Sequence, residues 1–161
     1  MVSGEIFLLF PLEVRLLIFL LFAIFTLLYI WNGKDFFKKK DWIVFFIKMV
    51  AGYIFSFILV FILVGVSKYL HLMSRENARA LVIALPISCF TILFSKFLVV
   101  MLNAIFYIVM IFHKRFNSSE NYVDLLTVYN RYGHAFHLFV KCLALLGSVF
   151  ILYGIWLGGA L

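Results

Sequence analysis

Residues 80–112 read ALVIALPISCFTILFSKFLVVMLNAIFYIVMIF, an apolar run in which Lys96 is the one charged residue. A single α-helix over this run would be about 50 Å long at about 1.5 Å per residue, whereas the hydrocarbon core of a bilayer is about 30 Å thick. Pro86 lies near the start of the run and cannot donate a helical hydrogen bond. We therefore predict a kinked helix, with 80–90 at the outer interface and 91–112 crossing the membrane. The alternative is a re-entrant segment that dips around Pro86 and surfaces near Lys96.

The composition of the whole chain extends this interpretation beyond one segment. Of its 161 residues, 66% are hydrophobic and 13% are charged, whereas about half and about a quarter are usual in soluble domains. A water-soluble fold of this size cannot bury so much apolar surface, so we expect most side chains to face lipid. In hydrocarbon, backbone amides must pair within their own segment, which favours helices. We predict an all-α, polytopic transmembrane helical bundle, with residues 1–161 forming a single transmembrane domain.

Breaks in the apolar pattern divide the chain into about four spans. They are predicted at about 11–31, 42–66, 91–112 and 135–157. Pro11 suits the first turn of the first span, and Asp41 is predicted to be the N-cap of the second helix. Residues near 120–132 show apolar positions at helical spacing. This pattern predicts a short amphipathic helix in the membrane interface, which Gly133 is expected to end.

Basic residues produce a formal net charge of +7 and lie mainly beside the predicted spans. The connections after the first and third spans contain Lys34, Lys38, Lys39, Lys40, Lys114, Arg115 and Arg131. The opposite side contains Arg15, Lys68, Arg75 and Arg79. Because cytoplasmic connections carry the excess of Lys and Arg, we predict that both termini are outside, in a bacterial inner (plasma) membrane. We expect Lys38, Lys39 and Lys40 to contact the anionic headgroups of the lipid bilayer. We expect no nucleic acid to bind, since no basic patch falls on a soluble domain.

Four polar residues lie inside apolar runs, where a charged side chain is costly and often marks function. Lys48 and Lys141 are close enough to the cytoplasmic ends of their predicted helices to snorkel to the surface. Lys96 and Asn103 are less easily explained and are the candidate intramembrane polar residues. We expect Asn103, near the middle of its span, to form an interhelical hydrogen bond that fixes helix packing. The alternative is that it lines a wet pore.

Small residues in the second and fourth spans predict places where helices approach closely. Gly52 and Ser56 form a small-xxx-small pair, and Gly147 and Gly154 are seven residues apart. Such spacings put small side chains on one helix face, which lets two backbones come together. These contacts lie either inside the bundle or between protomers. We expect a homo-oligomer or an association with other membrane subunits.

Three histidines are the candidates for a metal or haem site: His113, His134 and His137. His134 and His137 are three residues apart and share a face if the helix is continuous there. Gly133 weakens that argument, and no HExxH-type pattern is present. Histidines at a membrane interface are a simpler explanation, and the two cysteines have no metal-binding spacing. We therefore predict no metal and no cofactor.

Enzyme signatures are absent from the sequence, which contains no GxSxG pattern, no phosphate-binding loop and no paired carboxylates. None of its seven acidic residues falls near the middle of a predicted span. We predict a small, non-enzymatic integral membrane protein that acts as a helical subunit or interaction partner of a membrane assembly. The first alternative, motivated by Lys96 and Asn103, is a pore-forming or membrane-perturbing effector, such as a phage-defence, immunity or lysis protein. The second is a haem- or metal-binding membrane redox subunit.

Overall fold

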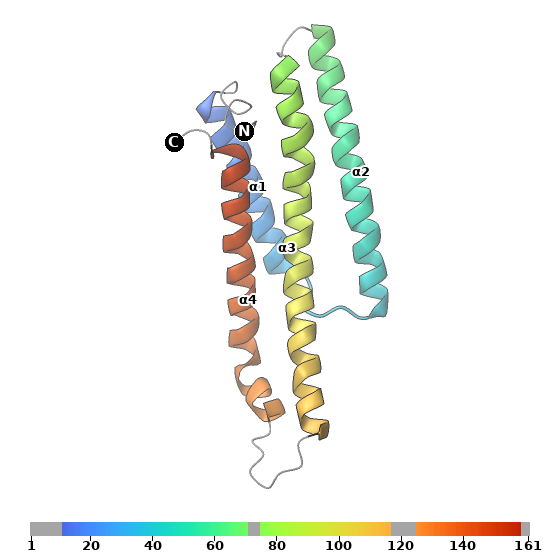
Figure 1. The fold of residues 1–161 in the computed structure, drawn as a ribbon, viewed down its shortest axis with the longest axis vertical. Coiled ribbons are helices and arrows are strands. Elements are labelled where there is room, and N and C mark those ends of the chain that lie inside the picture. Colours follow the sequence, from blue (N-terminus) through green and yellow to red (C-terminus); the bar gives the residue numbers. More distant parts are fainter. Residues whose placement is uncertain (1–10, 71–74, 117–124, 159–161) are drawn as a thin grey trace.

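Long α-helices make up almost all of the chain that the computed structural model describes, which is residues 11–70, 75–116 and 125–158 (Figure 1). The described residues form α1 (Leu12–Asn32), α2 (Lys39–Leu70), α3 (Arg75–Phe116) and α4 (Leu125–Trp156). Each of these helices is long and apolar enough to cross a membrane. By length and composition the protein is therefore an all-α integral membrane protein, which confirms this part of the prediction.

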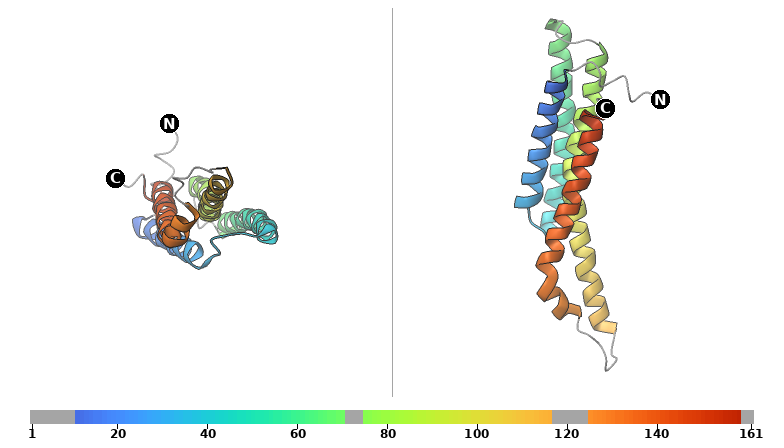
Figure 2. Two further views of the ribbon diagram at one scale, coloured as in Figure 1. Left: turned by 90° about the horizontal axis from the view of Figure 1, so that it is seen from below. Right: turned by 90° about the vertical axis from the view of Figure 1, so that its left-hand side faces the viewer.

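The central element of the bundle is α3. It packs against each of the other helices, and α1 also packs against α4. Within the described ranges, α2 packs against α3 alone. The view from below in Figure 2 shows α1 and α2 as separate helices that are bridged by their connecting loop. The side of α3 that lies between α1 and α2 is therefore not closed by direct packing of those two helices.

Two buried apolar clusters hold the helices together. The first joins all four helices towards the end of α4 and contains Val60, Leu81, Ala84, Leu85, Leu152, Trp156 and Leu157, with Phe22 of α1 packed against it. The second lies beside the end of α1 and contains Ile30, Val99 and Val140. Aromatic contacts such as the stacked pair Phe45–Phe97 attach the first turns of α2 to α3. Most other apolar side chains face outward, as expected where lipid is the solvent.

The long apolar run forms one continuous helix. α3 has 42 residues, which corresponds to about 63 Å at about 1.5 Å per residue. It passes through Pro86 without interruption, so the re-entrant alternative is wrong, and a bend at Pro86 stays a prediction. Pro86 is tolerated because its side chain is buried and neighbouring helices can compensate for a lost backbone hydrogen bond in lipid.

The prediction that Gly133 ends a separate helix is also wrong. α4 runs from Leu125 through Gly133 to Trp156 as one element. Glycine costs only about 1 kcal/mol in a helix relative to alanine, and Gly133 is buried, so packing outweighs its weak helix propensity. The first part of the predicted amphipathic helix, 120–124, lies outside the described residues. An interfacial position for 120–132 stays a prediction.

Asp41 does cap α2, but from the third helical position rather than from the N-cap. The helix begins at Lys39, and Asp41 Oδ2 accepts a hydrogen bond from the backbone N–H of Lys38 at 2.9 Å. This is one half of a capping box, in which a side chain at position N3 reaches back to the N-cap. Lys34 Nζ donates to Asp41 Oδ1 at 2.7 Å, so the same carboxylate also holds the loop between α1 and α2. Pro11 likewise precedes α1 at the N-cap rather than in its first turn.

Candidate functional site

Lys96 is buried in the middle of α3, at the level where α1 ends. Its side chain is 3% exposed, and Nζ donates a hydrogen bond to the backbone carbonyl of Ile30 at 3.1 Å. Ile30 lies in the last turn of α1, where carbonyl groups have no partner within the helix and the helix dipole adds partial negative charge. The ammonium group of Lys96 therefore caps α1 from another helix. This contact explains why one charge is tolerated within the long apolar run.

Gly33, directly after α1, leaves the space that the Lys96 side chain occupies. A Cβ atom at residue 33 would lie 2.6 Å from Lys96 Cε and 2.7 Å from Lys96 Nζ. The backbone there has φ −83° and ψ 159°, an extended conformation open to any residue. Lack of space, rather than backbone freedom, therefore favours glycine at this position.

Asp35, in the loop between α1 and α2, joins two lysines from different helices. Its Oδ2 lies 2.8 Å from Lys141 Nζ of α4, and its Oδ1 lies 3.7 Å from Lys96 Nζ of α3. Oδ1 is buried without a hydrogen bond, so it depends on the nearby charge of Lys96. Lys141 Nζ also lies 6.0 Å from the centre of the Trp31 ring, within range of a cation–π interaction. A single carboxylate thus holds the loop against both α3 and α4.

Asn103 connects the same loop to α4. Its side chain is fully buried, and Nδ2 donates to the backbone carbonyl of Asp35 at 3.4 Å. Its Oδ1 lies 2.8 Å from His137 Nδ1, and because an amide oxygen only accepts, Nδ1 is the donor in this pair. The ring of Phe36 meets the ring of His137 edge to face, with 5.0 Å between the centroids. Asn103 therefore makes an interhelical hydrogen bond, at the level of a loop rather than in the middle of a span.

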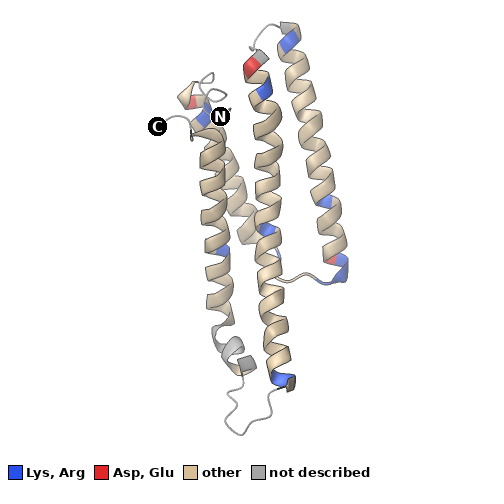
Figure 3. Cartoon of the chain, in the orientation of Figure 1, with Lys and Arg blue, Asp and Glu red and all other residues tan. Residues whose placement is uncertain are grey.

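We call Asp35, Lys96, Asn103, His137 and Lys141 the loop network. Figure 3 shows that the charged residues of the described helices gather at three levels along the bundle. One level is the end of the bundle where α1 and α3 begin and α2 ends, with Arg15, Lys68 and Arg79. The second is the loop network with Lys48, and the third is the far end of α3, with Lys114 and Arg115. The two predicted intramembrane polar residues therefore belong to a belt of polar groups where the loop meets the helices.

Sequence reasoning missed Asp35 and Gly33, and it explained Lys141 by snorkelling alone. One signal was present: Asp35 is followed directly by Phe36 and Phe37, and an acidic residue beside aromatics in a loop suggests docking rather than free exposure. The sequence did not show that the loop lies level with Lys96 and Lys141. That register depends on how far α3 and α4 extend past the end of α1.

The predicted packing residues divide into two groups. Gly52 faces α3, where an added Cβ would lie 3.3 Å from Leu93, and Ser56 is buried on the same helix. Gly147 and Gly154 are exposed on α4, and an added Cβ would meet no atom within 4 Å in either case. Within the described part of one chain, only the first pair is therefore placed for close helix approach.

The three candidate metal ligands do not come together. Among the described residues, no group of three His, Cys, Asp or Glu side chains is arranged to hold a metal ion. His113 is exposed near the end of α3, whereas His137 is bonded to Asn103. His134 and His137 line a small pocket together with Asp35 and Lys141, where the Asp35 carboxylate is already paired with Lys141 at 2.8 Å.

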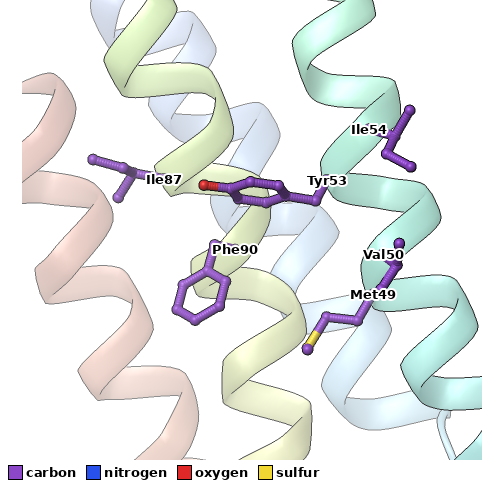
Figure 4. Close-up of a pocket in the computed structure, with 6 residues that line it drawn as sticks. All are labelled: Met49, Val50, Tyr53, Ile54, Ile87 and Phe90. Carbon is purple, nitrogen blue, oxygen red and sulfur yellow. The ribbon is translucent and has the colours of Figure 1, made fainter.

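Two further hollows lie beside α2. The first, of about 380 Å³, is bounded by the end of α1, the connecting loop, the start of α2 and α3, and its lining includes Lys34, Asp41, Lys48 and Lys96. We call it the basic pocket. The second, of about 420 Å³, lies between α2 and α3 and is almost entirely apolar. Figure 4 shows Tyr53 reaching from α2 towards α3 across this second hollow, with Ile87 and Phe90 on the α3 side.

The fold and the loop network define a small polytopic helical membrane protein whose first connecting loop is bound into the bundle by a buried ion-pair and hydrogen-bond network. The chain matches no protein-family model, no curated protein and no solved structure.

Proposed function

We propose that the protein is a non-enzymatic helical subunit or interaction partner of a membrane assembly, and that the far part of α3 is its docking surface. The observation that carries this proposal is the length of α3 beyond the loop network. Residues 104–116 continue for about 20 Å at about 1.5 Å per residue, past the level at which α1 ends and α2 begins (Figure 1).

The polar belt indicates where the membrane ends. Residues 80–95, between Arg79 and Lys96, span about 24 Å. Lysine side chains that snorkel outward extend this thickness towards the roughly 30 Å of a bilayer. In this placement the crossing part of α3 lies near 80–99, about 30 Å, rather than at the predicted 91–112. With the more basic connections in the cytoplasm, both termini are outside.

Residues 104–112 beyond the belt are almost entirely apolar, and among the described residues they pack against α4 on one side, where Phe106 stacks on Phe136, and are exposed elsewhere. Ile105 is 47% exposed, Ile108 is 62% exposed and Phe112 is 59% exposed. Large exposed apolar patches outside the hydrocarbon core mark surfaces that another molecule covers. A partner subunit, or a second copy of the chain, would remove these side chains from water.

A photo-crosslinking residue at Ile108 tests this proposal in membranes. The matched probe is at Leu20, an exposed residue of α1 that lies within the proposed membrane-crossing part of the bundle. We expect protein–protein adducts from position 108 and lipid adducts alone from position 20. The adduct mass distinguishes a homodimer from a complex with another subunit. Lipid adducts from both positions would contradict the proposal and favour a bilayer that reaches the far end of α3, with 120–132 at its interface.

A pore-forming or membrane-perturbing function has less support from the geometry. The pair that motivated it is buried: Lys96 is bonded to α1, and Asn103 is bonded to the loop and to α4. Under the proposed function, expression of the chain leaves the membrane potential unchanged. A collapse of the potential that Lys96→Leu abolishes would favour the pore.

A further inference from the structure

The basic pocket carries more positive charge than its neighbours neutralise. Its lining contains three lysines, Lys34, Lys48 and Lys96, and one acidic residue, Asp41. The carboxylate of Asp41 pairs with Lys34 at 2.7 Å. Lys48 has no ion pair within the described ranges. Lys96 also has Asp35 Oδ1 at 3.7 Å, but Asp35 is shared with Lys141. The four lysines and two carboxylates of the pocket and its ion-pair partners therefore have a formal charge of +2, a charge that favours an anion.

The groups that line the pocket are suited to a phosphate. Lys96 is almost completely buried, and its ammonium group is held by the Ile30 carbonyl, so one strong donor is fixed in the inner wall. An ammonium group has three donors. The hydrogen bond to Ile30 uses one of them and Asp35 Oδ1 lies near a second, so one donor is left for a ligand. Lys48, on α2, also lines the pocket and is exposed, so its long side chain can adjust to a ligand. A fixed cation and a mobile one, on two different helices, can bind one phosphate group from two sides.

The pocket opens towards lipid. Its walls come from α1 and α2, which do not pack against each other within the described residues. Val44 on α2 lines the pocket and is 49% exposed, and Leu28, next to the pocket-lining Tyr29 on α1, is 50% exposed. Exposed apolar side chains of α1 and α2 therefore adjoin the pocket. A ligand that has a phosphate at one end and acyl chains at the other fits this arrangement of charge and apolar surface.

We propose that the basic pocket binds the headgroup of one anionic phospholipid, whose phosphate lies between Lys48 and Lys96 and whose acyl chains lie against α1 and α2. This site is separate from the general attraction of Lys38, Lys39 and Lys40 for the membrane surface, because none of these three residues lines the pocket. It is also independent of the docking surface on the far part of α3, so either proposal can fail alone.

The test is native mass spectrometry of the full-length chain released from nanodiscs that contain equal amounts of phosphatidylglycerol and phosphatidylcholine. We expect one phosphatidylglycerol molecule to be retained in preference to phosphatidylcholine. Lys48→Gln is expected to weaken its retention about fivefold, since a lysine near an anionic surface contributes about that factor to binding. Lys40→Gln is the matched control, because Lys40 is exposed in the first turn of the same helix and lies outside the pocket; it is expected to leave retention unchanged.

A second variant is expected to change lipid retention in the opposite direction. Asp41→Asn removes the acidic charge of the pocket and releases Lys34, while the amide oxygen can still accept from Lys38 N–H. Retention of phosphatidylglycerol is expected to increase, an outcome that a damaged fold cannot produce.

Three results would overturn the proposal. They are equal retention of the two lipids, equal losses in Lys48→Gln and Lys40→Gln, and displacement of the bound lipid by inorganic phosphate at millimolar concentration. The last result would assign the pocket to a free anion rather than to a lipid.

Discussion

Lys96 is stabilised in an apolar helix by acceptors from other elements. Two of them, the Ile30 carbonyl and Asp35 Oδ1, lie within 3.1 and 3.7 Å of its Nζ. Both acceptors are close to the end of α1, and neither can be recognised from the residues next to Lys96 in the sequence. The charge therefore contributes to the fold by joining α3 to the end of α1 and to the loop. Removing it would destabilise the fold because the Ile30 carbonyl and Asp35 Oδ1 would lose their partner.

Replacing Lys96 by methionine keeps the apolar stem and removes the ammonium group. Because Asp35 Oδ1 and the Ile30 carbonyl then lose their nearest donor, we expect the free energy of unfolding in detergent micelles to fall by about 1–3 kcal/mol. The control is Lys40→Met, which changes an exposed lysine at the start of α2 and is expected to have little effect. Equal losses in the two variants would show that Lys96 is not a structural cation.

Replacing Gly33 by alanine tests the space that Lys96 needs. The new methyl group would overlap Lys96 Cε and Nζ, so the lysine must move and weaken its hydrogen bond to Ile30. We expect a loss of about 1 kcal/mol in the free energy of unfolding. In a Lys96→Ala background the same substitution is expected to cost less, because the overlapping lysine atoms are gone and only the Tyr29 carbonyl, 3.1 Å from the new Cβ, remains close. Additive effects in this double-mutant cycle would contradict the explanation.

At the scale of elements, polar side chains join α3 to α4 along their length. Ser95 and Ser148 share a hydrogen bond between the two helices. Nearer the end of α4, the indole N–H of Trp156 donates to Ser88 Oγ at 2.9 Å, and Ser88 Oγ donates in turn to the Ala84 carbonyl at 2.7 Å. Trp156 also stacks on Phe22 of α1, so one side chain connects three helices.

Ser88→Ala leaves the buried indole N–H of Trp156 without its acceptor. We expect a loss of about 1–3 kcal/mol in the free energy of unfolding, the usual cost of a buried unsatisfied donor. Phenylalanine at position 156 has no donor, so Ser88→Ala in a Trp156→Phe background is expected to cost much less. If the serine substitution costs the same in both backgrounds, the hydrogen bond does not contribute to stability.

At the scale of the whole molecule, the distribution of basic residues predicts the orientation in the membrane. Lys39 and Lys68 lie at opposite ends of α2 and are both exposed, so they report on the two sides of the membrane from one helix. In intact cells, Lys68→Cys is expected to react with a membrane-impermeant maleimide, whereas Lys39→Cys is expected to react only after permeabilisation. Cys89 and Cys142 are replaced by alanine in both variants. The reverse pattern would place both termini inside.

The helices of this protein could be predicted from the sequence more completely than the loop network. The predicted spans 11–31 and 42–66 lie within or close to α1 and α2, because about 20 apolar residues between polar breaks can satisfy their backbone in lipid only as helices. The re-entrant alternative at Pro86 and the expected break at Gly133 are wrong, because both helices continue through these residues and packing outweighs their local cost. Lys96 and Asn103 were found as unusual residues, but their partners Asp35 and His137 were not.

The amino-acid sequence by itself determined that this chain is a set of apolar helices with basic connections, since that conclusion follows from the solvent that its side chains require. The tertiary structure alone decided that Asp35 meets Lys96 and Lys141, that Gly33 makes room for a lysine, and that α3 continues beyond the end of α1. These facts depend on the relative displacement of helices along their axes. Similar apolar surfaces can slide past one another at little cost, so hydropathy does not encode that displacement, whereas a few buried polar contacts do.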